Sequence, residues 1–451
     1  MKNLHFSERP IIKTEIPGEN SRRLIQAQTE LESNNVSYPK ALPIAWKKAK
    51  GATIEDADGN ILFDFFSSAG VANAGHNNPY IEEALKEITD HPNHCLDFPT
   101  ESKQKFVEKI FSLLPENERS NYKVNFGGPT GSDAIEAAVK LAKINTKRSS
   151  VIAFQGAYHG MTGVALSLTS KSSHKVNFQP ALQVNFMPYA YCYRCPMYKT
   201  SDTCKLECAR FVRDCIENPH SGIEKPAAIV VEPIQAEAGN IIPREGWHHE
   251  IASIAKDHEI PLIFDEIQVG NFRTGKFLAC QHFGVMGDII ALAKGIGGGG
   301  YPISLILLKR QLDKWNPGTH IGTFRANQRA IVAGYASLNF MTDHHIENHI
   351  SKLSVIIREG LEEAVKVCDF IGEFRGIGLL YAIEFVKNKK TREPASDYAG
   401  KIKDYCFRKG ILMEIGGHYN NSLRILPPLT ITENMAKVAM EIIIEACANL
   451  K

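Results

Sequence analysis

Between about residues 120 and 340 the chain alternates short apolar runs with segments of helical spacing, and this alternation constrains the fold more than any other feature. The runs are KVNF, VIAF, AAIVVEP, PLIFDE, DIIALAK and ISLILL. Between two of them, Ile135, Ala138, Val139 and Ala142 share one helical face. Strands buried on both faces with helices between them predict an α/β fold. We expect a mostly parallel sheet flanked by helices, with ligands at the carboxyl ends of the strands.

The length of 451 residues predicts two domains. We assign the alternating region to a large domain over residues 61–345. Beyond it the sequence changes to a charged amphipathic helix, a strand pair around GIGLLYAIEFV, and RILPPLT before a final helix. These elements predict a smaller α+β domain over residues 346–451. Residues 1–60 are expected to join it, and GATIEDADGNILFDF predicts a hairpin around Asp58-Gly59-Asn60.

Charge and hydropathy exclude several classes of protein. Lysine and arginine total 52 against 50 for aspartate and glutamate, so no broad cationic surface for nucleic acid is expected. No run approaches the roughly 18 apolar residues of a membrane span. The first residues, MKNLHFSERP, lack the apolar segment of a secretion signal. We therefore expect a cytoplasmic protein with neither a membrane nor a nucleic-acid partner.

Two ionisable side chains stand at the ends of apolar runs. Asp265 ends one in LIFDEIQVGNFRTG, and Lys294 ends another in DIIALAKGIGGGGYP. Burying a carboxylate is costly unless a cationic or hydrogen-bonding group meets it. Desolvation makes a lysine amine more nucleophilic at neutral pH, and the glycines after Lys294 leave room beside it for a flat ligand. We interpret Asp265 as an acid with a cationic partner. Lys294 is interpreted as an amine that reacts with a carbonyl, rather than as a surface lysine.

Two further stretches each allow two interpretations. NFGGPTGSDAIEAAVKLAK predicts a strand, a glycine-rich turn and a helix starting near Ser132, whose N–H groups suit a phosphate. Alternatively, Ser132 or Asp133 only caps that helix. VIAFQGAYHGMTG ends a strand in Tyr158 and His159, aromatic side chains that either stack on a planar ring or pack in the core.

Taken together, these four features match the needs of one cofactor. Pyridoxal phosphate requires a site for its phosphate, an aromatic face for its ring, an acid for its ring nitrogen and a lysine for its aldehyde. The acid keeps the ring nitrogen protonated, so that the ring can act as an electron sink. The ring nitrogen would then be the cationic partner of Asp265.

Four of the ten cysteines lie close together in YCYRCPMYKTSDTCKLEC. They are Cys192, Cys195, Cys204 and Cys208. A CxxC pair followed by a second pair is typical of zinc sites, but the short spacer and the CxxxC form of the second pair depart from that pattern. We favour a metal-free surface insertion with redox-sensitive thiols over a bound metal.

From about Trp46 onward the chain resembles the class III aminotransferases, a family of pyridoxal-phosphate enzymes of fold type I. The motifs that carry the resemblance occur in the family's order: GATIEDADGNILFDFFSSAGVANAGHNNP, GPTGSDAIEAA, YHG, VVEPIQAEAG, DEIQ, the ALAK lysine, GTFRANQ and RILPPL. The resemblance implies that Lys294 binds the cofactor aldehyde and then moves a proton between substrate and cofactor carbons. It also implies that Asp265 binds the ring nitrogen.

The resemblance further implies a set of cofactor contacts and a shared site. The cofactor-binding residues would be Gly131 and Ser132 at the phosphate, Tyr158 and His159 at the ring, Gln268 at the phenolic oxygen, and Thr323 from a second subunit. A site completed in this way implies a homodimer, and further pairing into tetramers is left open.

For the substrates, the resemblance implies that Arg424 pairs with the α-carboxylate of the keto acid. A guanidinium suits this task because it can bind a carboxylate with two parallel hydrogen bonds. Glu237 would mask Arg424 while the amino donor is bound. Glu232 matches a pocket acid by position, and its role is left open.

Within the family, GPTGSDAIEAAVKLAK and LDKWNPGTHIGTFRANQ are similar to 2,4-diaminobutyrate:2-oxoglutarate aminotransferases. The alternatives are a racemase or an aminotransferase for another donor, such as 4-aminobutyrate or ornithine, because the YCYRCP insertion resembles one in such members. A non-enzymatic role for the cysteine loop is disfavoured because Lys294 and Asp265 are both present. Asn271 and Phe272 stand where the family has an aromatic residue and then glycine, which bears on donor specificity.

Overall fold

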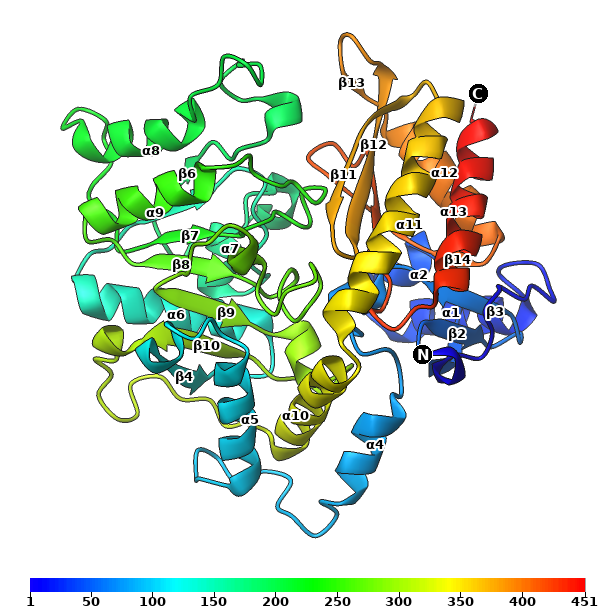
Figure 1. Cartoon of the computed structure of the whole chain (residues 1–451), viewed down its shortest axis with the longest axis horizontal. Coiled ribbons are helices and arrows are strands. Elements are labelled where there is room, and N and C mark those ends of the chain that lie inside the picture. The colour runs from blue at the N-terminus through cyan, green and yellow to red at the C-terminus, as the bar shows by residue number, and fades with distance from the viewer. Residues whose placement is uncertain (451) are drawn as a thin grey trace. The chain divides into compact units, whose positions relative to one another are not determined.

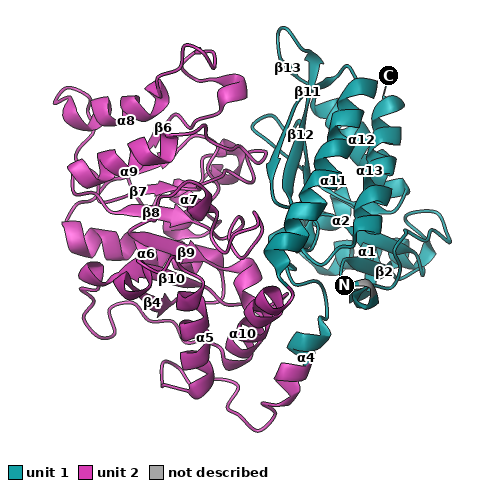
Figure 2. Ribbon diagram, viewed as in Figure 1, with its two compact units in different colours: residues 1–82, 345–451 teal, residues 83–344 magenta. Residues whose placement is uncertain are grey.

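The computed structural model describes residues 1–450 and divides the chain into two compact units (Figure 2). Unit 1 combines residues 1–82 with residues 345–451, and unit 2 comprises residues 83–344. Both ends of the chain therefore contribute to one unit, and the middle segment forms the other. The N-terminal part of unit 1 extends to residue 82, beyond the residue 60 of the sequence-based division.

Unit 2 contains a seven-stranded sheet with the order β4-β10-β9-β8-β7-β5-β6. Its strands are β4 (Tyr122–Phe126), β5 (Val151–Phe154), β6 (Val184–Met187), β7 (Ile229–Val231), β8 (Leu262–Asp265), β9 (Ile289–Leu292) and β10 (Leu305–Lys309). Neighbours among β5 to β9 pair in parallel, whereas β10 is antiparallel to both β4 and β9. This confirms the predicted mostly parallel α/β sheet, although β6 was not among the predicted strands.

Helices flank this sheet (Figure 1). They are α5 (Glu101–Ser112), α6 (Gly131–Thr146), α7 (Gly163–Leu168), α8 (Glu207–Glu217), α9 (Trp247–Asp257) and α10 (Gln328–Asp343). α6 packs on β8, β9 and β10 through a buried face that includes Ala134, Ala138 and Leu141. Its small alanines allow the helix to approach the strands closely. No helix within residues 1–450 is both long and apolar enough to cross a bilayer.

The N-terminal part of unit 1 forms a small sheet with the order β1-β2-β3-β14. Its strands are β1 (Trp46–Lys50), β2 (Thr53–Asp56), β3 (Ile61–Asp64) and β14 (Ile411–Leu412), and the helices nearby in sequence are α1 (Glu19–Leu31), α2 (Tyr38–Ala41), α3 (Ser67–Gly70) and α4 (Pro79–Lys86). β2 and β3 form the predicted antiparallel hairpin. The C-terminal strand β14 pairs in parallel with β3, so the two ends of the chain share one sheet.

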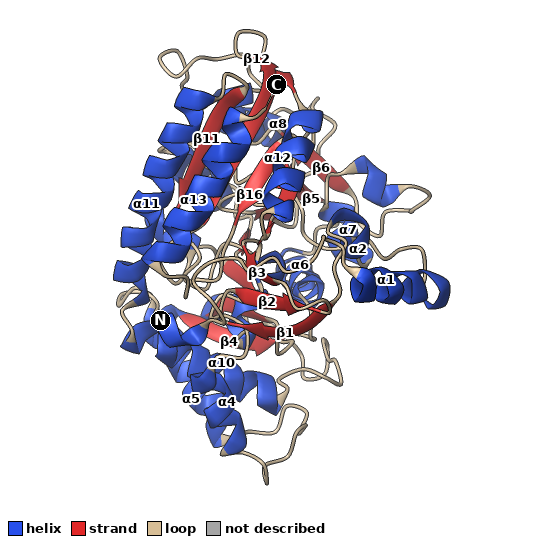
Figure 3. Cartoon of the chain, turned by 90° about the vertical axis from the view of Figure 1, so that its right-hand side faces the viewer, coloured by secondary structure: helices blue, strands red, loops and turns tan. Residues whose placement is uncertain are grey.

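The second sheet of unit 1 has the order β11-β12-β16-β15, with β13 beside β12. Its strands are β11 (Ile371–Ile377), β12 (Leu380–Asn388), β13 (Glu393–Pro394), β15 (Glu414–Gly416) and β16 (Ser422–Ile425). The helices of this region are α11 (Ile346–Val367), α12 (Ser396–Arg408) and α13 (Glu433–Ala448). α11 and α13 run side by side (Figure 3). α11 contacts β11, and α12 contacts β12, β15 and β16.

Candidate active site

A cavity of about 330 Å³ in unit 2 lies where several strands of the sheet end. The chain reaches its walls directly after β4, β5, β7, β8 and β9, because parallel strands present their carboxyl ends at the same edge of a sheet. Of the residues predicted for the site, the cavity is lined by Gly131, Ser132, Tyr158, His159, Glu232, Glu237, Asp265, Gln268 and Lys294. Thr323 and Arg424 are not in its lining.

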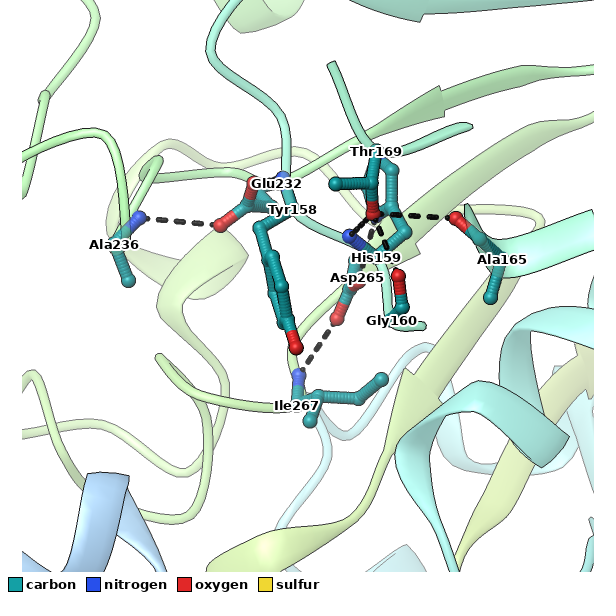
Figure 4. Close-up of polar contacts among 9 residues, drawn as sticks. All are labelled: Tyr158, His159, Gly160, Ala165, Thr169, Glu232, Ala236, Asp265 and Ile267. Carbon is teal, nitrogen blue, oxygen red and sulfur yellow. Dashed lines mark hydrogen bonds and ion pairs between the residues drawn. The ribbon is translucent and has the colours of Figure 1, made fainter. Parts of the chain in front are cut away.

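Asp265, the last residue of β8, has its carboxylate held at two points (Figure 4). Its Oδ2 lies 2.7 Å from Nδ1 of His159, and its Oδ1 accepts a hydrogen bond of 3.0 Å from the N–H of Ile267. Burial acts to lower the pKa of His159, but the hydrogen bond and charge of Asp265 outweigh it, and the pKa is raised. The buried acid therefore has a histidine partner within the protein, which sequence reasoning did not identify.

Glu232, the residue after β7, is buried beside this pair (Figure 4). Its Oε1 accepts a 3.0 Å hydrogen bond from the N–H of Tyr158, and its Oε2 accepts a 3.1 Å bond from the N–H of Ala236. Burial raises the pKa of Glu232 to about 7; the charge of Asp265 also raises it, and that of His159 opposes the rise.

Glu266, the second acid of the DE pair, faces the other way. Its carboxylate is fully buried and accepts hydrogen bonds of 2.8 Å and 2.7 Å from the N–H groups of Ala279 and Cys280. Burial raises its pKa to about 7. Because successive residues along an extended chain point to opposite sides, one acid reaches the cavity and its neighbour holds a loop.

The N-terminus of α6 opens into the cavity at Thr130, Gly131 and Ser132. Thr130 is the N-cap of this helix, and Asp133 completes a capping box with it, since its Oδ2 accepts a 2.8 Å hydrogen bond from the N–H of Thr130. The capping interpretation is thus correct for Asp133, while Ser132 lines the cavity. Gly160 has a φ of +131°, and a side chain there would collide with Oγ of Ser132. The space at the helix end depends on glycine at this position.

Lys294 is the first residue of the short 3-10 turn Lys294–Gly297 that follows β9. Its backbone φ of +52° is rare for a residue other than glycine, and such strain is concentrated at functional sites. The two unusual residues of the neighbouring loop, Asn271 and Phe272, also have positive φ values, of 54° and 66°. The Asn271 amide donates a 3.3 Å hydrogen bond to the carbonyl of Ala293 and so links that loop to the lysine turn.

Gln268 and Glu237 meet at the cavity wall. The Gln268 amide donates a 3.2 Å hydrogen bond to Oε1 of Glu237. The ring of Tyr158 lies in the same cavity, where burial raises its pKa and the charges of Glu237 and Asp265 add to the rise. The half-buried Glu237 is therefore an acid whose orientation is set by a neighbouring side chain.

Arg424 belongs to unit 1, where it is buried in the middle of the second sheet. It lies opposite Glu414 in the antiparallel pair β15–β16, and its Nη1 is 3.4 Å from Oε2 of that glutamate. Sequence reasoning missed Glu414, because a three-residue strand gives too short a pattern to predict the register.

Thr323 is exposed in unit 2, in the segment between Ile321 and Phe324. Both of these apolar side chains are 66% exposed. The residue therefore lies on the surface of the chain, between two exposed apolar side chains.

The cysteine loop lies outside the cavity lining. Within residues 1–450, no group of three or more histidine, cysteine, aspartate or glutamate side chains is arranged to hold a metal ion. All four thiols of the loop are reduced, and burial raises the pKa of Cys208 to about 12. A thiol with so high a pKa is a poor nucleophile at neutral pH.

The residues that line the cavity fit pyridoxal phosphate in their chemistry. The helix N-terminus at Gly131 and Ser132 could hold the phosphate, and Gly160 leaves the space that a side chain would fill. Asp265 offers a carboxylate for the ring nitrogen, and Lys294 offers an amine for the aldehyde.

Comparisons with known proteins agree with this fit. A family model described as class-III aminotransferase matches residues 34–447. A diaminobutyrate–2-oxoglutarate transaminase of Wolinella succinogenes is 38% identical over 92% of this chain and 94% of its own. A diaminobutyrate–2-oxoglutarate aminotransferase of Rhizobium meliloti (strain 1021) is 37% identical over 91% of this chain and 89% of its own.

Solved structures share the fold. An aminotransferase of Bacillus anthracis superposes with a TM-score of 0.84 at 24% identity, covering 97% of this chain and 99% of its own. The ornithine aminotransferase of Toxoplasma gondii, described with partial occupancy of PLP at its active site, has a TM-score of 0.81 at 25% identity. It covers 95% of this chain and 94% of its own.

Proposed function

The chain belongs to the class-III aminotransferases, and from this premise we propose that it transfers the 4-amino group of L-2,4-diaminobutyrate to 2-oxoglutarate. The products would be L-aspartate 4-semialdehyde and glutamate. The observation that carries the proposal is the identity of 37–38% to relatives named for these two substrates, over more than nine-tenths of the chain.

The enzyme is a pyridoxal-phosphate-dependent transaminase. When bound, the cofactor supplies an electron sink for the carbon that loses or gains the amino group. We assign the phosphate to the N–H groups at Gly131 and Ser132, where the helix dipole favours an anion. Tyr158 would hold the ring face and Gln268 the phenolic oxygen, and both side chains line the cavity.

Two side chains carry the proton chemistry in this proposal. The Asp265 carboxylate holds a proton on the ring nitrogen, since a buried anion favours the cationic form of a neighbouring base. The Lys294 amine would hold the proton that leaves the donor carbon and act as the acid or base that moves it. The strained backbone at Lys294 supports this role, because it places the side chain in the cavity rather than along the strand.

For the acceptor half-reaction, we assign Arg424 to the α-carboxylate of 2-oxoglutarate. A buried guanidinium favours an anion that can accept two hydrogen bonds at once. Glu237 is assigned to the masking of this charge while the cationic donor is bound, and its half-buried carboxylate is compatible with a change of partner.

We also propose that the enzyme is a cytoplasmic homodimer in which Thr323 completes the phosphate site of the partner subunit. Exposed apolar side chains support a covered surface here, because exposed apolar patches mark interfaces. Ile321 and Phe324 flank Thr323, and Leu96 and Phe98 lie on the segment whose Asp97 pairs with Arg325.

The proposal is tested by the visible absorbance of the purified holoenzyme. Addition of L-2,4-diaminobutyrate alone should remove the band of the lysine-bound cofactor, and subsequent addition of 2-oxoglutarate should restore it with formation of glutamate. If only 4-aminobutyrate or ornithine removes the band, that amine is the donor in place of diaminobutyrate. Racemisation of an amino acid without loss of the band would favour the racemase alternative.

A further inference from the structure

The carboxylate of Glu232 bridges two loops of the cavity wall. One oxygen accepts the N–H of Tyr158, in the loop after β5, and the other accepts the N–H of Ala236, in the loop after β7. The residue is only 6% exposed. A carboxylate with both oxygens held by the backbone and so little surface is placed to fix the loops rather than to meet a substrate.

The loop that Glu232 holds is the one that carries His159 (Figure 4). On the other side of this loop, the hydroxyl of Thr169 accepts a 3.0 Å hydrogen bond from the N–H of His159 and lies 2.9 Å from the carbonyl oxygen of Gly160. The backbone at residues 158–160 is thus held from both sides. The hydrogen bonds to Glu232 and Thr169 hold His159 where its ring lies 2.7 Å from Asp265.

Glu232 also adds a third ionisable group to the buried pair. His159 and Asp265 face its carboxylate, and their charges act on it in opposite directions. The other titratable groups close to it are the phenols of Tyr158 and Tyr189, and the Tyr189 hydroxyl donates a 2.9 Å hydrogen bond to the main-chain oxygen of Glu232. A charged His159 alone would cancel the charge of Asp265. Burial opposes ionisation of Glu232, but the two backbone N–H groups and the charge of His159 favour its carboxylate form, and in that form it gives the cluster a net negative charge.

We propose that Glu232 is a positioning residue for the cofactor: it fixes the Tyr158–His159 loop against Asp265 and maintains the negative charge that Asp265 presents to the ring nitrogen. This inference rests on the binding of pyridoxal phosphate in the cavity, not on the identity of the amino donor. Glu232 then acts at the cofactor, whereas the family resemblance had grouped it with the substrate-binding residues.

The test compares Glu232→Gln with Glu136→Gln, which makes the same change at a half-buried acid outside the cavity lining whose carboxylate also accepts backbone N–H groups, those of Val164 and Ala165. Glutamine keeps one acceptor oxygen but turns an N–H group toward the second backbone donor. We expect cofactor affinity to fall about tenfold in E232Q, because a buried donor loses its partner. The apparent pKa of the cofactor's absorbance change should also fall, because a cluster with less negative charge favours the protonated, cationic form less. E136Q should leave both quantities near those of the wild type.

Kinetics separate positioning from substrate contact. In E232Q, kcat should fall while the KM values for donor and acceptor change by no more than about twofold, since a residue that acts through the cofactor alters substrate binding little. When His159→Asn is also present, E232Q should lower the apparent pKa of the cofactor's absorbance change by less than it does alone. The reason is that Glu232 acts on the cofactor through His159. Unchanged cofactor affinity and titration in E232Q, together with a raised KM, would overturn the proposal.

If E232Q does not fold, Glu232→Asp provides the test. Aspartate retains the charge but is too short to bridge both N–H groups, so we expect a titration near that of the wild type with weakened cofactor binding. Wild-type cofactor affinity in E232D would contradict the bridging role. Cofactor affinity and the absorbance titration are both measured without an amino donor, so they test the role of Glu232 whichever donor the enzyme uses. Failure of the wild type to bind pyridoxal phosphate would instead overturn the proposed function.

Discussion

The cavity edge of the unit 2 sheet and the β15–β16 edge of the unit 1 sheet hold their charged groups in different ways. At the cavity edge, Asp265 has contacts of 2.7 Å and 3.0 Å, and Glu232 is held by two backbone N–H groups. At the other edge, Arg424 meets Glu414 at 3.4 Å, longer than the roughly 2.8 Å of a strong charge-assisted hydrogen bond. The first arrangement suits a fixed cofactor, and the second suits a cation that exchanges partners during the reaction.

The largest effect is expected from Lys294→Ala. Removing the amine should lower kcat by at least about 10⁴-fold, because the variant loses both covalent attachment and proton transfer. Lys309→Ala is the matched control, since Lys309 ends the antiparallel strand β10 and pairs with Asp288 at 2.8 Å. Steady-state glutamate formation measures both variants. Comparable losses in the two would show that the cavity edge has no special role.

The next effect is expected at the paired acids of β8. Asp265→Asn should lower kcat by about 10³-fold with little loss of stability, because asparagine keeps the shape but not the charge at the ring nitrogen. Glu266→Gln should behave in the opposite way, losing about 1–3 kcal/mol of unfolding free energy as a buried N–H group loses its acceptor. Glutamate formation and urea denaturation are measured for both variants. A large loss of activity in E266Q with unchanged stability would contradict a catalytic role for Asp265 and a structural role for Glu266.

A smaller effect concerns the pH dependence of stability. The pKa of Glu266 is about 7 in the folded protein against the usual 4.5, so the folded state binds this proton more tightly than the unfolded state. Its contribution is therefore most favourable at low pH and is lost as pH rises from the unfolded value to the folded one. Between about pH 5.5 and about pH 7.5 the loss amounts to about 2 kcal/mol. Urea denaturation of E266Q should lack this decline, and an identical decline in wild type and variant would assign it to other groups.

The smallest effect is expected at the pair of Arg424 and Glu414, whose contact is the longer one. Glu414→Gln should lower the KM for 2-oxoglutarate about threefold and raise that for diaminobutyrate by a similar factor, because Arg424 loses a competing anion and presents more positive charge to the donor. Glu393→Gln, which alters an exposed acid paired with Lys387, is the control. Changes of both KM values in the same direction would argue that Glu414 acts only on the fold.

Local patterns predicted the cavity edge well. The α/β alternation fixed which strand ends lie together, so Asp265, Lys294 and the α6 N-terminus could be assigned to one edge before the structure was known. The partners that depend on distant contacts could not be predicted. His159 is 106 residues from Asp265 in the chain, and nothing in YHG indicates a hydrogen bond rather than stacking.

The same reasoning explains the other misses. β6 was overlooked because prolines stand near both ends of VNFM, at positions 180 and 188, and prolines are typical of loops and strand edges. Glu414 was overlooked because β15 has three residues, too few for a pattern of alternation. The role of Glu232 follows from two backbone N–H groups, which carry no sequence signal at all.

The central claim is that nitrogen passes from the 4-position of the donor to 2-oxoglutarate. It is tested most directly by incubating the holoenzyme with 2-oxoglutarate and L-2,4-diaminobutyrate that carries heavy nitrogen at the 4-position only, and by mass analysis of the glutamate formed. The proposal predicts that the glutamate carries the heavy label in full. Unlabelled glutamate, with the heavy nitrogen retained in the remaining donor, would contradict it.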